Sequence, residues 1–338
     1  MINDVSVICP LSLESTKVNG ASPRCECCDE ALPPLYLREG QNMLPLPIQF
    51  FGLSRHGKTT YLAALTMALQ RANAIWNGFT ALAATKSSQR FIRDVNIYFA
   101  TGKLPPVTPL GIKDSYLMLL KRIPKWGTTA LMVRDCSGEA FREIEIDLQE
   151  ASFLLKGPIT LLFISLEDFK DSGGYTLDTL LTSYLNALAA HGARLEREHR
   201  KVIVVLTKAD LFWNSLPEDL CNYITADPLW QPLQQEDTPQ WRVADMDSYL
   251  ATLNRISGSI EDWICNQFAG RTLVTLARDH NIEIQFSLVS STGAAPRTQD
   301  NALAIQWQPS RVLDPFLWAL ELDSRRREEI SRYFWGGR

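Results

Sequence analysis

The chain has 338 residues and a formal net charge of −4 at pH 7, with 46% hydrophobic and 21% charged residues. This usage is close to that of ordinary globular proteins, which excludes a disordered or fibrous chain, and the small net charge gives no reason to expect nucleic acid as the main partner. The longest apolar run, residues 159–166, is far short of the roughly 18 residues that a membrane helix needs. The first residues also lack the basic start and long apolar run of a signal peptide.

The first 45 residues differ in composition from the rest. Cysteines, prolines and turn-forming residues dominate, and four of the seven cysteines fall within the first 28 residues. We therefore predict a separate N-terminal module over residues 1–45 that ends in an irregular tether. Seven cysteines with this crowding near the N-terminus favour a reducing, cytoplasmic setting and suggest a metal site.

The cysteine spacing resembles part of a zinc ribbon. Cys25 and Cys28 form a C-x-x-C pair, and Cys9 precedes a proline as in the first half of such a ribbon. A structural zinc site needs four ligands, but Ser12 stands where the second cysteine of the first half would be. Either Cys27 completes a zinc site, or the site has decayed and these residues are free thiols.

From residue 46 onward, short apolar runs alternate with stretches of helical periodicity. This order predicts an α/β fold with a doubly wound, mostly parallel sheet over residues 46–295. A stretch rich in Trp, Pro, Asp and Gln at 213–245 is predicted to be an insertion, and residues 296–338 a helical extension that either packs on the domain or binds a partner. The predicted strands are 46–51, 115–122, 129–135, 159–165, 201–206 and 282–289, and the predicted helices are 58–73, 87–100, 141–155, 176–191 and 246–268.

A phosphate-binding loop is predicted where the first of these strands meets the first helix. The residues there spell G-x-x-x-x-G-K-T between an apolar strand and a helix, which is the context that this motif requires. Gly52 and Gly57 allow a tight turn with inward-pointing amides, Lys58 would reach the β and γ phosphates, and Thr59 would offer its hydroxyl to Mg²⁺. The other predicted nucleotide contacts in this loop are Ser54, Arg55, His56 and Thr60.

A second motif, D-x-x-G, follows the strand that ends at Asp135. In nucleotide switches such an aspartate holds the Mg²⁺ shell, and the glycine amide, here that of Gly138, senses the γ phosphate. Thr108 is the predicted threonine that closes over Mg²⁺ and phosphate, because it lies just before a strand that can pair with the one ending at Asp135. Thr101 and Thr80 are alternatives for this role.

The strand VIVVL is followed by Thr207, Lys208, Ala209 and Asp210. The Asp210 carboxylate could accept hydrogen bonds from N1–H and N2–H₂ of guanine, a donor pair that adenine lacks, so the sequence predicts GTP rather than ATP. The stem of Lys208 would lie over the base and Thr207 would tie this loop to the phosphate loop. Ser290 and Ser291, at the end of the sixth predicted strand, are predicted to offer backbone amides to the guanine oxygen.

Taken in order, GLSRHGKTT, VTP, DCSGE, TKAD and VSSTG resemble the five signature stretches of translation-factor and Ras-like GTPases, over about residues 46–293. GKTTYLAAL, DCSGEAF and the cysteine-bearing N-terminus further resemble the bacterial double-GTPase family, whose members are encoded with partner proteins in suspected conflict or defence systems. The resemblance implies hydrolysis of GTP to GDP and phosphate, a nucleotide-dependent switch and a protein partner. Glu139 departs from the pattern, because it replaces the glutamine that orients water, and Thr207 replaces the usual asparagine.

Two other functions remain open from the sequence. The first is a scaffold that senses GTP with little hydrolysis and recruits a partner or a second copy through its switch loops. The second is an ATP-dependent enzyme with the same phosphate loop, against which Asp210 argues. We expect Lys58, Thr108, Gly138 and Glu139 to take part in catalysis, with Mg²⁺ held by Thr59, Thr108 and Asp135.

Overall fold

A computed structural model of the chain describes residues 6–18, 23–40, 43–106, 116–137, 153, 155–169, 177–193, 200–234, 241–267, 270–297, 302–304 and 306–335. Its strands are β1 (Ser6–Ile8), β2 (Ser15–Lys17), β3 (Leu44–Gly52), β4 (Thr80–Ala83), β5 (Tyr116–Ile123), β6 (Gly127–Ser137), β7 (Ile159–Ser165), β8 (Arg200–Thr207) and β9 (Ile282–Leu288). Its α-helices are α1 (Pro34–Glu39), α2 (Lys58–Arg71), α3 (Lys86–Thr101), α5 (Leu177–Ala190), α6 (Glu218–Thr225), α7 (Val243–Gln267), α8 (Arg271–Asp279) and α9 (Asp314–Trp335). Short 3₁₀ turns lie at Ala72–Ala74, Leu166–Phe169, Ala209–Leu211, Trp213–Ser215 and Pro232–Gln234.

A mixed sheet forms the centre of the protein. Seven of the described strands belong to it, in the order β4-β5-β6-β3-β7-β8-β9. The five strands from β6 to β9 run parallel, whereas β5 is antiparallel to β6 and β4 is antiparallel to β5. The predicted α/β, doubly wound architecture is therefore confirmed. Because parallel strands end at the same edge, the loops after β3, β6, β7, β8 and β9 gather there.

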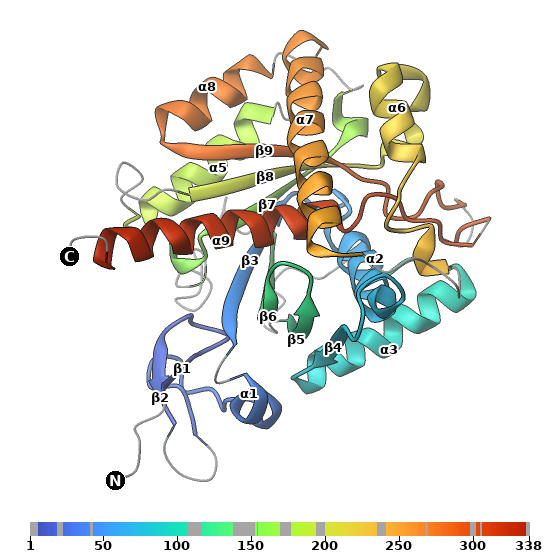
Figure 1. Cartoon of the computed structure of the whole chain (residues 1–338). Helices are drawn as coiled ribbons and strands as arrows, with labels where there is room; N and C mark the ends of the chain where they lie inside the picture. Colours follow the sequence, from blue (N-terminus) through green and yellow to red (C-terminus); the bar gives the residue numbers. More distant parts are fainter. Residues whose placement is uncertain are drawn as a thin grey trace.

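Helices cover both faces of this sheet. On β3 the side chains alternate, so Phe50 packs against Tyr61 of α2 with ring centroids 5.6 Å apart, and Phe51 packs against Tyr184 of α5 at 5.4 Å. Helices α2 and α5 therefore lie on opposite faces. Figure 1 shows α9 crossing the sheet beside α7, and α9 contacts β3, β7 and β8.

The insertion and the C-terminal segment meet in a buried polar network. Arg311 donates through Nε to the Tyr223 carbonyl at 2.8 Å and through Nη1 to the Tyr249 hydroxyl at 2.8 Å. Both tyrosine hydroxyls in turn donate to Asp314, the first residue of α9. This network joins α6, α7 and α9, and residues 312–323 are all buried. The first half of α9 is thus packed against the sheet and α7.

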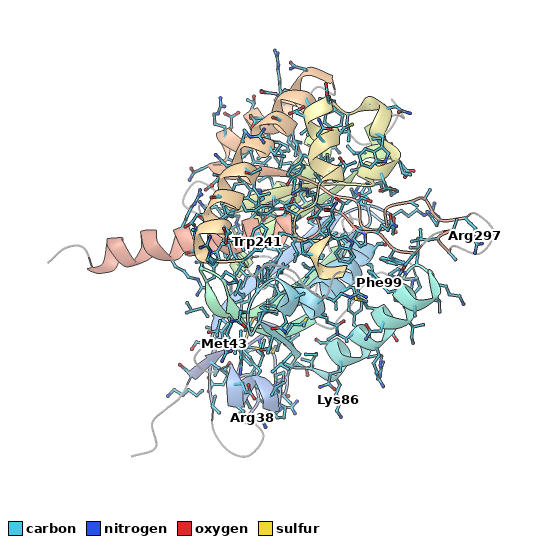
Figure 2. All side chains as sticks on the ribbon, turned by 45° about the vertical axis from the view of Figure 1, so that its right-hand side comes forward. Arg38, Met43, Lys86, Phe99, Trp241 and Arg297 are labelled. Carbon is cyan, nitrogen blue, oxygen red and sulfur yellow. The ribbon has the colours of Figure 1, made fainter. Side chains whose placement is uncertain are left out.

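The N-terminal module packs on the sheet as well. Its core includes Tyr36 of α1 and contacts Leu117, Leu119, Ala130 and Met132, which lie on one face of β5 and β6. The intervening residues of these strands belong to the other core, which includes α2 and α3. Figure 1 shows the module below the sheet, and Figure 2 shows its Arg38 and the nearby Met43 at that end.

Several elements differ from the sequence-based expectation. Strand β4 was not predicted, because its four residues lie at the sheet edge with alternate exposed side chains. Helices α1, α6 and α8 were also missed, since each is at most nine residues long, and α1 lies where an irregular tether was expected. The predicted helix 141–155 lies outside the described residues except for 153 and 155. None of the described helices is both long and apolar enough to cross a membrane.

Candidate functional site

The loop between β3 and α2 has the turn that the glycine pattern predicts. Gly52 ends β3 with φ of 154°, and a Cβ atom there would lie 2.6 Å from the Phe163 carbonyl oxygen, so β7 leaves no room for a side chain. Gly57 has φ of 82° and precedes the first residue of α2. Arg55 also adopts a positive φ, of 67°, and its side chain is exposed. The loop thus leads directly into the amino end of a helix, which favours anions.

Lys58 lies inside this loop, almost fully buried. Its Nζ donates to the carbonyl oxygens of Gly52 at 2.7 Å and Leu53 at 3.0 Å. It also lies 4.0 Å from Oδ1 of Asp135 on β6. The predicted lysine and the predicted metal-shell aspartate are therefore neighbours. Residues Ser54 and Thr60 are partly exposed in the same loop and helix.

Asp135 is a buried carboxylate with an unused acceptor. Burial raises its pKa above the usual value, although the charge of Lys58 and a hydrogen bond from the Thr59 side chain act in the opposite direction. Within the described part of the chain, Oδ1 has no hydrogen-bond partner. A buried carboxylate oxygen and a threonine hydroxyl at the mouth of a phosphate loop are hard oxygen ligands, and this donor set fits Mg²⁺.

His56 fastens the loop to the neighbouring strand. Its Nδ1 lies 2.8 Å from the Phe163 carbonyl, which can only accept, so Nδ1 carries the hydrogen. Its Nε2 lies 2.7 Å from Oδ2 of Asp168. We predicted His56 as a nucleotide contact, but its ring nitrogens face protein partners. Sequence reasoning missed Asp168, although an acidic pair directly after β7 was a usable signal, because β7 neighbours β3 in the sheet.

Thr207, at the end of β8, makes the predicted tie to the phosphate loop. Its hydroxyl lies 2.9 Å from the His56 carbonyl oxygen and 3.3 Å from that of Ile164. One side chain therefore links the ends of β7 and β8 to the loop after β3. This contact fixes the distance between the phosphate loop and the segment that contains Asp210.

Asp210 accepts a hydrogen bond from the segment that follows β9. The Ser290 hydroxyl donates to its Oδ1 at 2.6 Å, and the Gly293 amide donates to the same hydroxyl at 3.0 Å. Burial raises the pKa of Asp210, the Ser290 bond lowers it, and the nearby charge of Glu167 raises it further. Lys208 has a left-handed φ of 62° and pairs with Glu167, a partner that the sequence analysis missed.

The predicted role of Ser290 needs correction. We expected its backbone amide to face the base, but that amide donates to the Ser310 carbonyl at 3.1 Å, and the Ser310 amide returns a bond of 2.8 Å. The contribution of Ser290 is its hydroxyl. Ser291 is also buried, and its hydroxyl has no hydrogen-bond partner among the described residues. The contact of its backbone amide with the base stays a prediction.

Three predicted residues lie outside the described part of the chain, namely Thr108, Gly138 and Glu139. The two alternatives to Thr108 are described. Thr80 pairs with Lys121 across β4 and β5, whereas the end of β5 nearer Asp135 is Tyr116, so Thr80 lies toward the opposite edge of the sheet. Thr101 ends α3 and donates its hydroxyl to the Ile97 carbonyl at 2.7 Å.

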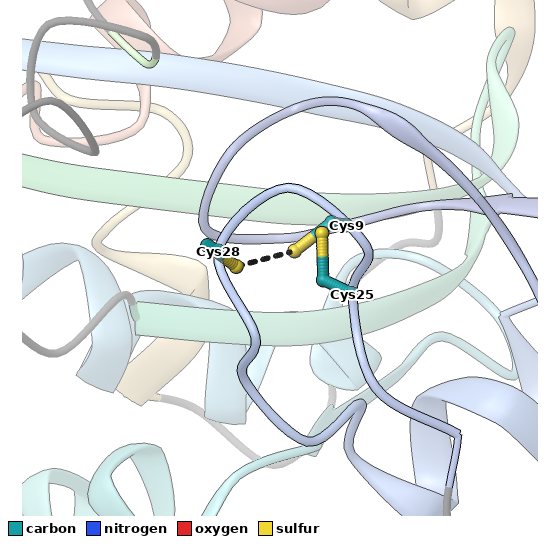
Figure 3. A group of neighbouring side chains, drawn as sticks. All are labelled: Cys9, Cys25 and Cys28. Atoms are coloured by element: carbon teal, nitrogen blue, oxygen red, sulfur yellow. Dashed lines mark hydrogen bonds between the residues drawn. The ribbon is translucent and has the colours of Figure 1, made fainter.

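Three N-terminal cysteines, which precede the phosphate loop in the sequence, form a cluster. The sulfur atoms of Cys9, Cys25 and Cys28 lie within 4.8 Å of one another (Figure 3). Cys27 is exposed and is not part of this group, so the alternative in which it completes the ligand set is wrong. Burial opposes ionisation of Cys25, but hydrogen bonds from Ser12, Thr16 and backbone amides outweigh it and lower its pKa to about 6. Burial raises the pKa of Cys28 to about 12.

Comparison with known families gives a match to a family model described as Double-GTPase 2, over residues 46–263. The match spans the phosphate loop, Asp135 and Asp210. No curated protein matches the chain significantly.

Three solved structures illustrate the similarity. A bacterial selenocysteine-specific elongation factor, EF-Sec, is 14% identical with a TM-score of 0.31, and the match covers 73% of this chain and 26% of that chain. The GTP-bound GTPase-like domain of Ski7 from S. cerevisiae is 14% identical with a TM-score of 0.35, covering 83% and 50%. An ADP ribosylation factor-like GTP-binding protein from Encephalitozoon cuniculi, with GDP, is 13% identical with a TM-score of 0.34, covering 85% and 84%. The chain thus spans about a quarter of the first of these chains and half of the second.

Proposed function

Because this chain belongs to the Double-GTPase 2 family, we propose that the loop between β3 and α2 binds the phosphates of GTP and that the segment around Asp210 reads the guanine base. The chain is accordingly a GTP-hydrolysing enzyme, which converts GTP and water to GDP and phosphate. The observation that carries the proposed site is the meeting of Lys58, Asp135 and the phosphate loop at one edge of the sheet.

In this proposal Lys58 and the loop amides bind the phosphate oxygens. Lys58 would exchange its bonds to the Gly52 and Leu53 carbonyls for bonds to the β and γ phosphates, with little movement of its buried stem. Thr59 and Asp135 would hold Mg²⁺, which neutralises charge on the phosphates. Oδ1 of Asp135, which accepts no hydrogen bond from the described residues, supports this assignment.

Asp210 would accept hydrogen bonds from guanine N1–H and N2–H₂. The Ser290 hydroxyl already occupies one side of Oδ1 and so orients the carboxylate. The stem of Lys208, whose ammonium pairs with Glu167, would lie along the base. Ser291 would contact the guanine oxygen through its amide.

The switch itself would be carried by Thr108, Gly138 and Glu139. Asp135 is two residues from the end of β6, so Gly138 follows the strand immediately and its amide is suitably placed in the chain to respond to a γ phosphate. We propose that Thr108 joins the Mg²⁺ ligands and that Glu139 stands near the attacking water.

We propose that a protein partner or a second copy acts through these switch segments, as in a bacterial conflict or defence system. GTP and reduced thiols make the cytoplasm the proposed compartment. The GTP-sensing scaffold stays the second candidate, since Glu139 is a poor substitute for the water-orienting glutamine. We also propose zinc as a structural cofactor of the N-terminal module.

The test of the proposed function is phosphate release with saturating Mg²⁺ and with the protein in excess over GTP, so that each bound GTP is hydrolysed in a single turnover. We expect release from GTP, none above background from ATP, and at least a tenfold loss of GTP affinity in Lys58→Ala, about 1.4 kcal/mol. Lys86→Ala, which removes an exposed lysine on α3, is the matched control. GTP binding without phosphate release would favour the scaffold, and equal use of ATP would refute the assignment of Asp210.

A further inference from the structure

Two turns of the N-terminal module have the same pattern of backbone hydrogen bonds. In the turns at 9–14 and 25–30, the amide of the first cysteine donates to the carbonyl of the residue five positions later, at 2.8 Å and 2.9 Å. The residue four positions after each cysteine donates back to the cysteine carbonyl at 2.9 Å in both turns. That residue has φ of 55° in the first turn and 54° in the second. The two turns are therefore structurally equivalent at an offset of 16 residues.

This equivalence aligns Ser12 with Cys28. The Glu14 amide donates to the Ser12 hydroxyl at 3.3 Å, as the Glu30 amide does to the sulfur of Cys28. The Ser12 side chain is fully buried, and its oxygen lies 3.4 Å from Sγ of Cys25. Ser12 thus holds the fourth corner of a group whose other corners are sulfur atoms.

In both turns, the backbone amide two residues after the first cysteine points at the sulfur of that cysteine. The Leu11 amide donates to Sγ of Cys9 at 3.4 Å, and the amide of Cys27 donates to the sulfur of Cys25. Amides directed at sulfur stabilise thiolate rather than thiol, as do the hydrogen-bond donors that contact metal ligands in proteins. Cys27 occupies the place of Leu11, and in both turns this residue contributes its backbone amide to the cysteine sulfur.

The spacing of the sulfur atoms suits a metal ion. Sγ of Cys9 and Sγ of Cys28 are 3.7 Å apart, and Figure 3 shows all three cysteine side chains converging. Zinc–sulfur bonds of about 2.3 Å in a tetrahedron put neighbouring sulfur atoms about 3.8 Å apart, whereas a disulfide needs about 2.05 Å.

We infer that the two turns form a structural zinc site with the thiolates of Cys9, Cys25 and Cys28 as ligands and the Ser12 hydroxyl at the fourth corner. This site goes beyond the zinc proposal above by naming its fourth ligand, and it does not depend on nucleotide binding. The site lies next to a contact between the module and the sheet, because Nη1 of Arg134 on β6 donates to the Leu11 carbonyl at 3.3 Å. Arg134 directly precedes Asp135, so zinc would hold the module against the strand that carries the Mg²⁺ ligand.

The test is the zinc content of the full chain, reduced and loaded with zinc, and its retention against a chelator. We expect about one equivalent in the wild type, loss in Cys28→Ser, and full retention in Cys27→Ser, the matched control in the same turn. Ser12→Cys should retain zinc at least tenfold better than the wild type, and Ser12→Ala at least tenfold worse.

Cobalt loading of the wild type gives a second readout that needs no destabilised variant. The thiolate-to-cobalt absorption should correspond to three thiolates in the wild type and four in Ser12→Cys. A wild type without zinc, or equal loss in Cys27→Ser and Cys28→Ser, would overturn the site. Equal retention in Ser12→Ala and the wild type would overturn the place of Ser12.

Discussion

The Ser290 hydroxyl donates a 2.6 Å hydrogen bond to Oδ1 of Asp210, across 80 residues of sequence. The bond joins the segment after β9 to the segment after β8, and a second bond from the Gly293 amide fixes the serine in turn. The carboxylate that we assign to base recognition therefore has its orientation set before any ligand binds.

Ser290→Ala should lower GTP affinity about tenfold, since a hydrogen bond to a charged group contributes about 1.5 kcal/mol. Titration calorimetry measures this directly. Ser287→Ala is the matched control, because Ser287 is a buried serine of β9 whose hydroxyl has no hydrogen-bond partner among the described residues. The same affinity in the Ser290 and Ser287 variants would show that the bond does not position Asp210.

Thr207→Val keeps the shape of the side chain and removes the bonds to the His56 and Ile164 carbonyls. Both carbonyls are left with one partner fewer in a buried place, so the free energy of unfolding should fall by about 1–2 kcal/mol. GTP affinity should also fall, because the phosphate loop loses its link to β8. Chemical denaturation with and without GTP measures both effects, and a variant as stable as the wild type would contradict the structural tie.

Asp314 should make the stability of the protein depend on pH. Burial raises its pKa from 3.8 to about 6 even though Arg311 lowers it, so the folded state holds the proton more tightly than the unfolded state. This contribution is fully present below about pH 4 and is lost as the pH rises to about 6, by an amount on the order of 3 kcal/mol at most. Asp314→Asn should lack this component in denaturation series across that range, and identical pH profiles would contradict it.

The sheet could be predicted from the sequence because its central strands are buried on both faces and so read as apolar runs. The strand from Ile159 to Ser165 was predicted to the residue. The elements that could not be predicted are those that form only because of tertiary contacts. Strand β4 forms because it pairs with the edge of β5, and its sequence contains no apolar run that would predict a strand. In the site, the order of motifs predicted that Lys58 and Asp135 both serve the bound nucleotide, and they lie 4.0 Å apart. The Phe163 carbonyl that holds His56 could not be found from the sequence, since it is a backbone group.

Intrinsic GTP hydrolysis should be slow and should accelerate with a partner or a second copy. Glu139 replaces a glutamine, and a carboxylate there is repelled by the triphosphate unless it is protonated or screened. Turnover of dilute protein should lie nearer 10⁻³ than 10 per second, the order seen when a GTPase lacks its stabilising arginine. Phosphate release measured across protein concentrations, alone and with neighbour-encoded partners, tests this. Fast release by dilute protein alone would show that the catalytic set is complete within one chain.

The most direct test of the account is nucleotide selectivity in Asp210→Asn. The substitution replaces one acceptor of the carboxylate with a donor, so it mismatches guanine and matches xanthine, whose base has an acceptor where guanine has a donor. Competition binding with GTP and xanthosine triphosphate, each with Mg²⁺, gives the preference of the wild type and the variant. We predict a wild type that prefers GTP and a variant whose preference is reversed or lost through tighter xanthosine triphosphate binding. A variant that keeps the wild-type preference for GTP would contradict the assignment of this site to guanine recognition.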